Sequence, residues 1–560
     1  SAADITVYSL ADPDRPQRIA ATVATPCPCQ VTFDTPVGGD AAYLALTAAG
    51  YLTPTAVTPA ATTDLLHPTD GADYLVITPA ALAPALDSLV EQRRAAGLRV
   101  RVVDVQAIYD DFGDGRPDPA AIQRFLNYTL TTWPTPAPAY ALLVGDGSYD
   151  PRGYQTPPPA NVLPAYLRFV DPVIGETVSD NRYTTATPDS QLPQLMIGRL
   201  PVRTLDEATA VIAKILAFEV APADAVWRRQ AVIVADNAYQ SDGRPDPAGN
   251  FWALADRAAA LLTAASQVVA RLYYNPCAAT TAIACDLPDP PYTRFADAAT
   301  LTAAFQASVH GGRGLVIYTG HASPLSWAGA PYLLRTGDVP TLGNHATPFV
   351  ALEMSCYTGF FHGPYDALAE TLVRAAGGGA VASWASSGQS PLRGQDVLLE
   401  QFLVTWLADP TAGVTLGQSV LAAKLHLYGA GGGAYASALD TFHLFGDPAL
   451  VLRSAVLSPT PTILPTASPT LTGTETPTIV ATASFTATPT AIATFMPTTP
   501  AATSTPVSVA SPTFAATLTL TPSATSSPLA TPWQSATHTP VPSGVRVFLP
   551  VVQAENQEAP

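Results

Sequence analysis

Hydrophobic positions alternate with polar ones in short runs over the first seventy residues of the chain. The runs ITVYSL, RIAATV and AAYLALTAA are separated by Pro, Asp and Gly residues of the kind found in turns. Alternation with a period of two is typical of half-buried strands. The pattern therefore predicts a small β module over residues 1–72.

From Asp73 onwards, continuous apolar runs are separated by segments with helical spacing. YLVITP and LRVRVVDV have the pattern of strands around a helix at residues 80–96, and a helix near 118–130 and the strands AYALLVGD and QLMIGRLPV extend the series. The helix that follows has Thr204 and Glu207 at the spacing of a capping box. Repeated β-α-β order favours a parallel sheet. We expect residues 73–220 to form a first α/β subdomain.

A second series of apolar runs predicts another α/β subdomain over residues 221–453. Its runs are RQAVIVAD, GLVIYTGH, PFVALEMSC and GGGAVASW, with an Ala-rich helix after the first of them. The first three end in Asp236, His321 and Cys356. Because the carboxyl ends of parallel strands meet at the edge where α/β proteins bind ligands, we expect these three side chains to lie close together.

The composition changes at residue 454 to Thr, Pro, Ser and Ala with almost no charge. Such a segment cannot bury a core, and its prolines favour an extended chain. We expect residues 454–542 to be a disordered linker of the kind that carries O-linked glycans. Residues 543–560 contain a short C-terminal apolar tag. A stalk of this kind suits attachment to a cell surface.

Charge argues against nucleic acid as a partner. The net charge is −17, only 13% of residues are charged, and no basic run is present.

An anionic membrane would repel the chain, and no apolar run reaches the 18 or so residues that a membrane span requires. The chain begins at Ser1 without a basic or apolar leader, as expected of a processed or truncated form. Protein or peptide partners remain.

The five cysteines leave one thiol without an obvious disulfide partner. Cys277 and Cys285 lie in a loop-like stretch that suits a small bridge, and Cys27 and Cys29 form a tight pair or bond elsewhere. Disulfides indicate an oxidising compartment, so we expect a secreted or cell-surface protein. Cys356 is left over, and its neighbours decide whether it is a buried apolar side chain or a reactive thiol.

A thiol nucleophile needs an imidazole, because an unperturbed thiol with a pKa of about 8.5 is ionised only to a few per cent at neutral pH. It also needs N–H donors for the oxyanion. If His321 and Cys356 follow neighbouring strands, the backbone amides of Cys356 and Ala322 face the same point. No HExxH or CxxC pair indicates zinc, and no cofactor is expected to be required.

In these segments the sequence resembles the gingipain-type cysteine peptidases, which are relatives of the caspases. The resemblance covers residues 73–453 and rests on seven ordered motifs: GDGSYD, SDNRY, IGRLPV, YTGHASPLSW, ALEMSCYTGFF, SPLRGQD and LFGDPALVLR. It implies a caspase-like α/β fold, a parallel-sheet sandwich in two halves. It also implies a secreted cysteine endopeptidase in which His321 and Cys356 form the catalytic dyad and Asp236 orients the imidazole. Trp327, in the histidine motif, is expected at the substrate.

Two departures from the family pattern bear on activity and specificity. Ala322 replaces the glycine that usually follows the catalytic histidine. Its backbone N–H is still available to the oxyanion, but its methyl group leaves less room for the substrate to approach. Family members that cleave after arginine have an acid that pairs with the substrate arginine, and the matching position in this chain is Asn250 or Phe251. Asp246 is nearby in the sequence but lies outside the expected helix. The apolar walls of that pocket are also altered, at Gly388 and Leu392. Strict arginine specificity is therefore not expected.

Three further readings stay open at this point. The acidic loops GDGSYD and DNRYTTATPD suggest structural calcium, as in related enzymes, although neither has a full EF-hand pattern. A catalytically degenerate peptidase-like module used for adhesion or binding would also suit a surface stalk. A serine hydrolase would use Ser323 or Ser355, but neither lies in a GxSxG elbow. Retention of both Cys356 and His321 favours the cysteine peptidase.

Overall fold

The structure is a computed structural model that describes residues 5–13, 15–24, 30–34, 42–52, 63–240, 244–276, 293–408 and 413–452. The chain divides by its internal contacts into two compact units, and the division falls between Thr58 and Pro59, somewhat before the predicted boundary at residue 72. The cysteines at 27, 29, 277 and 285 and the tail from residue 454 lie outside the described residues. The disulfide and linker predictions therefore stay predictions.

The first unit contains short antiparallel strands, as its alternating pattern predicts. β1 (Thr6–Ser9) pairs with β2 (Gln17–Ile19) on one side and β5 (Tyr43–Leu46) on the other, and β3 (Ala21–Ala24) pairs with β4 (Gln30–Phe33).

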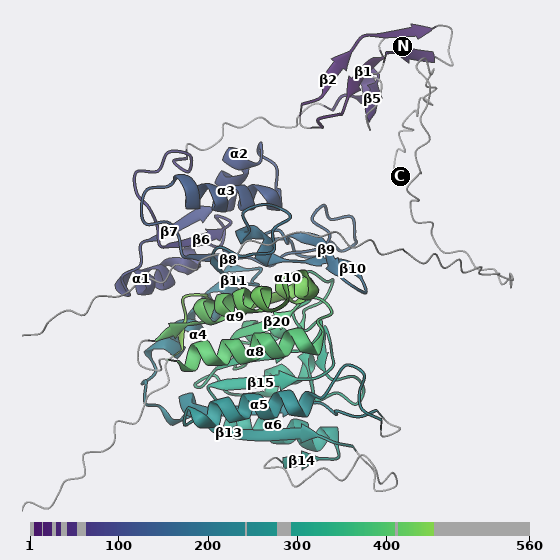
Figure 1. Cartoon of the computed structure of the whole chain (residues 1–560). Coiled ribbons are helices and arrows are strands. Elements are labelled where there is room, and N and C mark those ends of the chain that lie inside the picture. Colours follow the sequence, from purple (N-terminus) through teal and green to yellow (C-terminus); the bar gives the residue numbers. More distant parts are fainter. Residues whose placement is uncertain are drawn as a thin grey trace, which may run out of the picture. The chain divides into compact units, whose positions relative to one another are not determined.

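The second unit is built around one eleven-stranded sheet in the order β14-β13-β12-β15-β19-β20-β22-β11-β8-β6-β7 (Figure 1). The sheet strands, in chain order, are β6 (Tyr74–Thr78), β7 (Val100–Asp104), β8 (Tyr140–Val144), β11 (Met196–Leu200), β12 (Gln230–Ala235), β13 (Val268–Tyr274), β14 (Thr293–Phe295), β15 (Leu315–Thr319), β19 (Phe349–Met354), β20 (Ala380–Ser386) and β22 (Phe442–Phe445). The two predicted α/β subdomains, 73–220 and 221–453, thus share one sheet.

Strand direction reverses once in this sheet. Neighbouring strands are parallel from β14 to β20 and again from β22 to β7, but β20 and β22 pair antiparallel from Ser383 opposite Phe445 to Ser386 opposite Phe442. The expected parallel sheet is correct within each half and wrong at the junction. Apolar runs indicate strands, but they do not fix the direction of two strands far apart in sequence. The carboxyl ends of the two half-sheets consequently lie at opposite edges.

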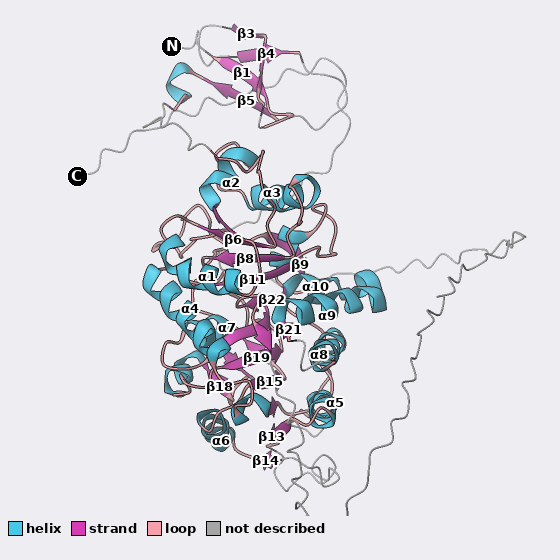
Figure 2. Ribbon diagram, turned by 90° about the vertical axis from the view of Figure 1, so that its left-hand side faces the viewer, coloured by secondary structure: helices cyan, strands magenta, loops and turns pink. Residues whose placement is uncertain are grey.

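Helices cover both faces of the sheet, and Figure 2 shows α1, α4, α6 and α7 on one side with α5, α8, α9 and α10 on the other. Both faces of β6 are buried, with Tyr74 and Val76 in the larger core cluster and Leu75 and Ile77 in the cluster that includes α2 and α3. The helices are α1 (Asp87–Ala95), α2 (Val105–Phe112), α3 (Pro119–Thr132), α4 (Leu205–Val220), α5 (Phe251–Ala264), α6 (Ala298–His310), α7 (Leu368–Arg374), α8 (Leu392–Leu407), α9 (Leu416–Gly431) and α10 (Ala436–Thr441). The burial of β6 side chains on both faces of the sheet is typical of parallel sheets.

Smaller elements lie outside the large sheet. They are the hairpin of β9 (Leu167–Asp171) and β10 (Gly175–Val178), the three-stranded sheet of β16 (Ala322–Ser323), β17 (Ser326–Trp327) and β18 (Leu334–Arg335), and the pair of β21 (Val414–Thr415) with β23 (Val451–Leu452). The predicted cap of α4 is present, since the Thr204 hydroxyl accepts the Glu207 N–H at 3.2 Å. The Glu207 carboxylate accepts the Arg203 N–H at 2.7 Å. No helix within the described ranges is both long and apolar enough for a membrane span.

A buried ion pair supports the junction between the half-sheets. Arg199, on β11, is fully buried, and its guanidinium donates to both carboxylate oxygens of Asp180 at 2.7 and 2.8 Å. Its remaining N–H groups donate to the carbonyls of Gly145, Leu163 and Pro164. Burial alone would raise the pKa of Asp180, but Arg199 holds that pKa below its usual range. The arginine thus has its charge and all of its donor directions satisfied.

We predict that Asp180→Asn lowers the free energy of unfolding by about 3–5 kcal/mol, because it leaves a buried guanidinium without a counter-charge. Since the pKa of Asp180 is lowered by folding, this contribution is present at neutral pH and is lost as the pH falls below about 4. Urea denaturation at several pH values measures both effects. The control is Asp189→Asn, which removes an exposed carboxylate 3.5 Å from Arg168 and should cost less than about 1 kcal/mol.

Candidate active site

Strand register brings Asp236, His321 and Cys356 to the same edge of the sheet. β12, β15 and β19 are adjacent and parallel, with Ala235 opposite Thr319 and Thr319 opposite Met354. His321 and Cys356 therefore each lie two residues beyond a directly paired position on neighbouring strands. Asp236 follows Ala235 immediately, and its N–H donates to the carbonyl of Thr319 at 2.9 Å. The edge expected from the sequence is the one observed.

Cys356 is the free cysteine of the described residues, and its thiol is largely enclosed. The N–H of Ser390 lies 3.5 Å from Sγ, and the Ser390 carbonyl oxygen lies 3.7 Å from it. Burial raises the pKa of the thiol, the Ser390 amide lowers it, and the carboxylate of Asp171 raises it. Without a base, this cysteine is therefore held as a thiol at neutral pH.

His321 has a half-exposed ring, and its polar partner is Asp246. The side chain is 49% exposed, Nε2 lies 3.0 Å from Asp246 Oδ2, and the ring meets Phe251 edge to face at 5.1 Å. Among the hydrogen bonds of the described residues, none joins His321 to Cys356, and Nδ1 has no partner. The ring is oriented by a carboxylate on one nitrogen while the other nitrogen is available.

Asp236 does not lie behind the imidazole as expected. Its carboxylate accepts the backbone N–H groups of Asn237 at 2.7 Å and of His321 at 3.2 Å. Burial raises the pKa of Asp236 to about 6, against the effect of these amides. The Asp236 carboxylate is thus bonded to the backbone N–H of His321 and not to its ring. The carboxylate bonded to the imidazole is that of Asp246, in the loop before α5.

Tyr318 holds the backbone carbonyl of His321 in place. Its hydroxyl donates to the His321 carbonyl at 2.5 Å and accepts the Ala328 N–H at 2.9 Å. Its ring stacks on Trp327 with centroids 4.6 Å apart, and the Trp327 indole donates to the buried carboxylate of Glu353 at 2.7 Å. Trp327 is fully buried, so the expectation that it contacts substrate is wrong.

Two backbone amides expected at the oxyanion have different surroundings. Ala322 lies in β16, opposite Trp327 of β17. The Cys356 N–H has no hydrogen-bond partner among the described residues and is available to an oxyanion. Tyr357, which follows it, has a φ of 62°, a left-handed conformation that is uncommon for a side-chain-bearing residue. This backbone turn is held by the Tyr357 N–H, which donates to the Gly388 carbonyl at 3.2 Å.

The residues predicted to shape the specificity pocket fall into two groups. Asn250 caps α5 by accepting the Ala253 N–H at 3.0 Å, and a Cβ on the adjacent Gly249 would lie 2.3 Å from Leu392 Cδ2. Asn250 and Leu392 are therefore close to each other, as expected. Gly388 is buried in the second group, where a Cβ would lie 2.7 Å from Asp171 Oδ2.

Asp171 and Ser390 are residues that the sequence analysis missed. Asp171 ends β9, and its Oδ2 accepts the N–H of Gln389, the neighbour of Ser390. The sequence VDPVIG has the turn residues of a hairpin, but nothing in it relates that turn to Cys356, which lies far along the chain. Only the folded chain reveals that a carboxylate from the first α/β half holds the loop that contacts the thiol.

The acidic loops suggested as calcium sites have other partners. Asp146, in GDGSYD, lies 2.6 Å from Arg203 and 3.7 Å from Arg374, and Asp150 accepts the N–H groups of Tyr154 and Gln155. Asp180, in the second loop, is paired with Arg199. Within the described ranges, no three or more His, Cys, Asp or Glu side chains form a group that could hold a metal ion. Structural calcium in these loops stays a prediction.

We predict that Asp171→Asn lowers the pKa of the Cys356 thiol. The carboxylate's negative charge opposes formation of the thiolate, so removing the charge should move the pH midpoint of alkylation to lower pH. The rate of Cys356 modification by iodoacetamide, measured from pH 5 to 10, tests this. The exposed Asp87→Asn variant should keep the wild-type midpoint, and an unchanged or raised midpoint in Asp171→Asn contradicts the prediction.

Known proteins resemble the chain in sequence and in fold. Gingipain R2 of Porphyromonas gingivalis is 32% identical over 159 residues, which is 26% of this chain and 20% of that protein. Gingipain R1 of the same organism is 32% identical over 159 residues and is covered to 15%. The matched region thus spans a fifth or less of the length of these relatives.

Among solved structures, the crystal structure of the Arg-specific cysteine proteinase gingipain R matches with a TM-score of 0.53 at 22% identity, covering 70% of this chain and 81% of that one. The complex of the RgpB pro- and mature domains matches with a TM-score of 0.51 at 21% identity, covering 68% and 80%. These likenesses establish the caspase-like fold. The model of peptidase family C25 matches residues 67–453, well over half of the chain. The protein therefore belongs to peptidase family C25, a family of cysteine-type peptidases.

Proposed function

We propose that the protein is a secreted cysteine endopeptidase that uses Cys356 as nucleophile and His321 as general base and acid. The observation that carries this proposal is the register that sets His321 and Cys356 each two residues beyond the paired Thr319 and Met354. The enclosed thiol and the half-exposed imidazole are the two groups at this edge suited to covalent catalysis of acyl transfer.

The imidazole acts as base and then as acid in each of the two halves of the reaction. His321 takes the proton from Sγ, and the thiolate attacks the carbonyl carbon of the scissile peptide bond. The amides of Cys356 and Ala322 stabilise the oxyanion that forms. The imidazolium then protonates the leaving amine, and a thioester remains. Water, deprotonated by His321, attacks the thioester carbonyl, and the C–S bond breaks to release the acid product. The imidazolium then returns the proton to the Cys356 thiolate.

The two carboxylates near His321 have separate roles in this proposal. Asp246, 3.0 Å from Nε2, stabilises the imidazolium and fixes the ring orientation. Asp236 and Tyr318 fix the peptide of His321 through its N–H and its carbonyl. Asp246 is then a residue of the catalytic group, and Asp236 is a positioning residue.

Specificity for arginine is not part of the proposal. A substrate guanidinium in a closed pocket needs a carboxylate, because an unpaired buried charge costs several kcal/mol. Gingipain R is described as Arg-specific. Here Asp246 is engaged by His321, and the Asn250 side chain caps α5. We propose that the residue before the scissile bond is neutral or polar.

The first prediction of this function is that Cys356→Ala abolishes peptide cleavage while the urea midpoint of unfolding stays nearly unchanged. Removal of one sulfur atom at the sheet edge leaves the core intact, but it removes the nucleophile. Hydrolysis of a fluorogenic peptide library measures the loss, with Ser355→Ala as the matched variant that should retain activity. Cleavage that survives in Cys356→Ala would overturn the proposal, and a wild-type protein that binds peptides without cleaving them would favour a degenerate binding module.

The second prediction separates catalysis from specificity at Asp246. Asp246→Asn should lower kcat by about 10- to 100-fold with little change in KM, and equally for peptides with Leu, Gln or Arg before the scissile bond. The reason is that the imidazolium loses its counter-charge for every substrate. Asp206→Asn, an exposed acid on α4, is the control. A hundredfold wild-type preference for Arg that Asp246→Asn abolishes would instead identify Asp246 as the specificity acid.

A further inference from the structure

The hairpin of β9 and β10 belongs to the first α/β half, but it is bonded to the segment that contacts the nucleophile. Asp171, at the end of β9, accepts the Gln389 N–H. The Thr177 hydroxyl donates to the Ser387 carbonyl at 3.0 Å, and the Ser387 hydroxyl donates to the Val178 carbonyl at 3.0 Å. The hairpin and residues 387–390 therefore form one hydrogen-bonded group next to Cys356.

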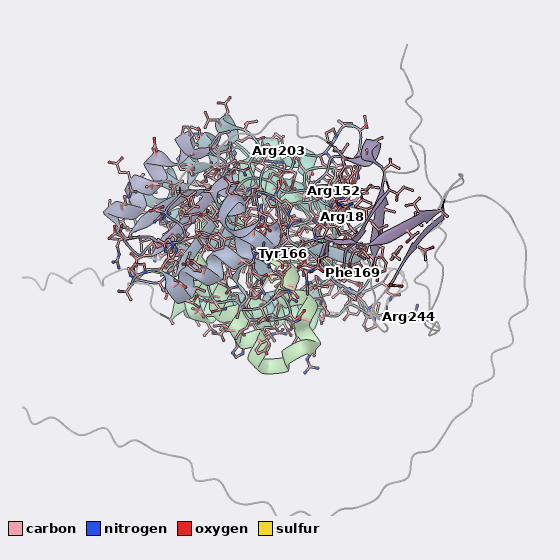
Figure 3. The ribbon with its side chains drawn as sticks, turned by 90° about the horizontal axis from the view of Figure 1, so that it is seen from above. Arg18, Arg152, Tyr166, Phe169, Arg203 and Arg244 are labelled. Atoms are coloured by element: carbon pink, nitrogen blue, oxygen red, sulfur yellow. The ribbon has the colours of Figure 1, made fainter. Side chains whose placement is uncertain are left out.

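The outer side of this hairpin presents large apolar side chains to solvent. Phe169 is 83% exposed, Val173 is 66% exposed and Ile174 is 47% exposed; Figure 3 labels Phe169 and the nearby Tyr166. The turn that carries two of them is ordered, because Asp171 Oδ1 accepts the N–H groups of Val173 and Ile174 at 2.7 and 2.8 Å. A group of exposed apolar side chains on a fixed backbone is typical of a binding surface.

A hollow of about 680 Å³ lies between the hairpin and the start of α10. Its lining includes Leu167, Phe169, Asp171, Glu176, Ala436 and Ser437. This volume is in the range of sites that bind small ligands or peptide side chains. The arginines at its margin are already paired, Arg182 with Asp440 at 2.6 Å and Arg168 with Asp189 at 3.5 Å. Glu176 forms no ion pair within the described ranges, so the hollow disfavours an occupant with a negative charge, and the exposed Phe169 in its lining offers a contact to an apolar side chain.

We propose that the hairpin β9–β10 and this hollow bind the polypeptide substrate at a distance from the scissile bond, with an apolar substrate side chain packed against Phe169. This inference rests on the proposed peptidase function. We infer a substrate chain as the occupant because a chain of contacts joins the hollow to Cys356. Asp171 lines the hollow and accepts the Gln389 N–H, and the next residue, Ser390, contacts Sγ. One residue step and two such contacts span roughly 10 Å from Sγ to the Asp171 carboxylate, and Phe169 lies two strand residues, roughly 7 Å, from Asp171. An extended peptide covers these distances in about three to five residues.

The test compares a short and a long substrate in the full chain. Both are fluorogenic peptides with the same two residues on each side of the scissile bond, and the long one is a decapeptide that also carries a Leu or Phe scanned through its outer positions. Wild type should prefer the long peptide when the apolar residue lies about three to five positions from the scissile bond. Phe169→Ser should lower kcat/KM for that peptide about 5- to 10-fold, mainly through KM, and leave the short peptide unchanged.

Val220→Ser is the matched control, because Val220 is 74% exposed at the end of α4 and away from the hairpin in sequence and fold. It should change neither substrate. An equal loss for both peptides in Phe169→Ser would mean that the hairpin shapes the catalytic residues, and no loss for either would mean that the surface does not bind substrate. Either result overturns the inference.

A binding measurement separates this inference from the proposed function. The Cys356→Ala variant should bind the fluorescently labelled decapeptide in an anisotropy titration, and Cys356→Ala combined with Phe169→Ser should bind it about 5- to 10-fold more weakly. If the wild type cleaves nothing but this difference in binding is found, the catalytic proposal fails and the binding surface stands. If cleavage is found and the two variants bind alike, the inference fails and the catalytic proposal stands.

Discussion

The antiparallel pairing of β20 with β22 is the contact on which the rest of the second unit depends. Two parallel half-sheets, each with its own helices, join there into one sheet through four opposed residue pairs. β22 is also the only described link between β20 and β11, through the pairing of Phe445 with Arg199. The buried guanidinium of Arg199 and the carboxylate of Asp180 lie at this junction, where a charge is tolerated because every donor has an acceptor. The reversal also explains why the first half approaches Cys356 with the β9–β10 hairpin, because the carboxyl ends of its own sheet strands lie at the opposite edge.

The sheet edge that carries Asp236, His321 and Cys356 is built by backbone interactions more than by contacts between these side chains. The peptide of His321 is held on its N–H by Asp236 and on its carbonyl by Tyr318, and Tyr318 is in turn fixed by stacking on Trp327. A Cβ at Gly320 would lie 2.3 Å from the Cβ of Asp236 and 2.4 Å from the Tyr318 hydroxyl, so a glycine is required between strand and histidine. The imidazole itself stays half exposed. A backbone held at both its N–H and its carbonyl, with a half-exposed ring, suits the proton transfers proposed for His321.

The sequence was sufficient for most strands of the large sheet, although β13 and β14 were not predicted. It was also sufficient for the edge that collects Asp236, His321 and Cys356, because long apolar runs with polar ends are typical of parallel strands. It was not sufficient for β22, a strand of four residues whose direction depends on a partner far away in the chain. The contacts of Asp236 and Asp246 were also out of reach, since no sequence pattern shows that Asp246 is bonded to the imidazole of His321 and Asp236 to its backbone N–H. Trp327 was misplaced because its position beside the histidine motif suggested exposure, whereas its stacking on Tyr318 buries it. Asp171 could not be identified, since its relation to Cys356 exists only in three dimensions.

The position of β22 has a consequence for synthesis on the ribosome. β11 is complete at Leu200, but its sheet partner β22 begins roughly 240 residues later. At a translation rate of roughly 5–20 residues per second, the hydrogen-bonding edge of β11 waits about 10–50 s for its permanent neighbour. Until then, the nascent first half presents an open strand edge, which is the feature that most readily recruits a strand from another chain. Incorrect pairing of β11 with other strands therefore competes with folding until the last strand of the sheet has emerged.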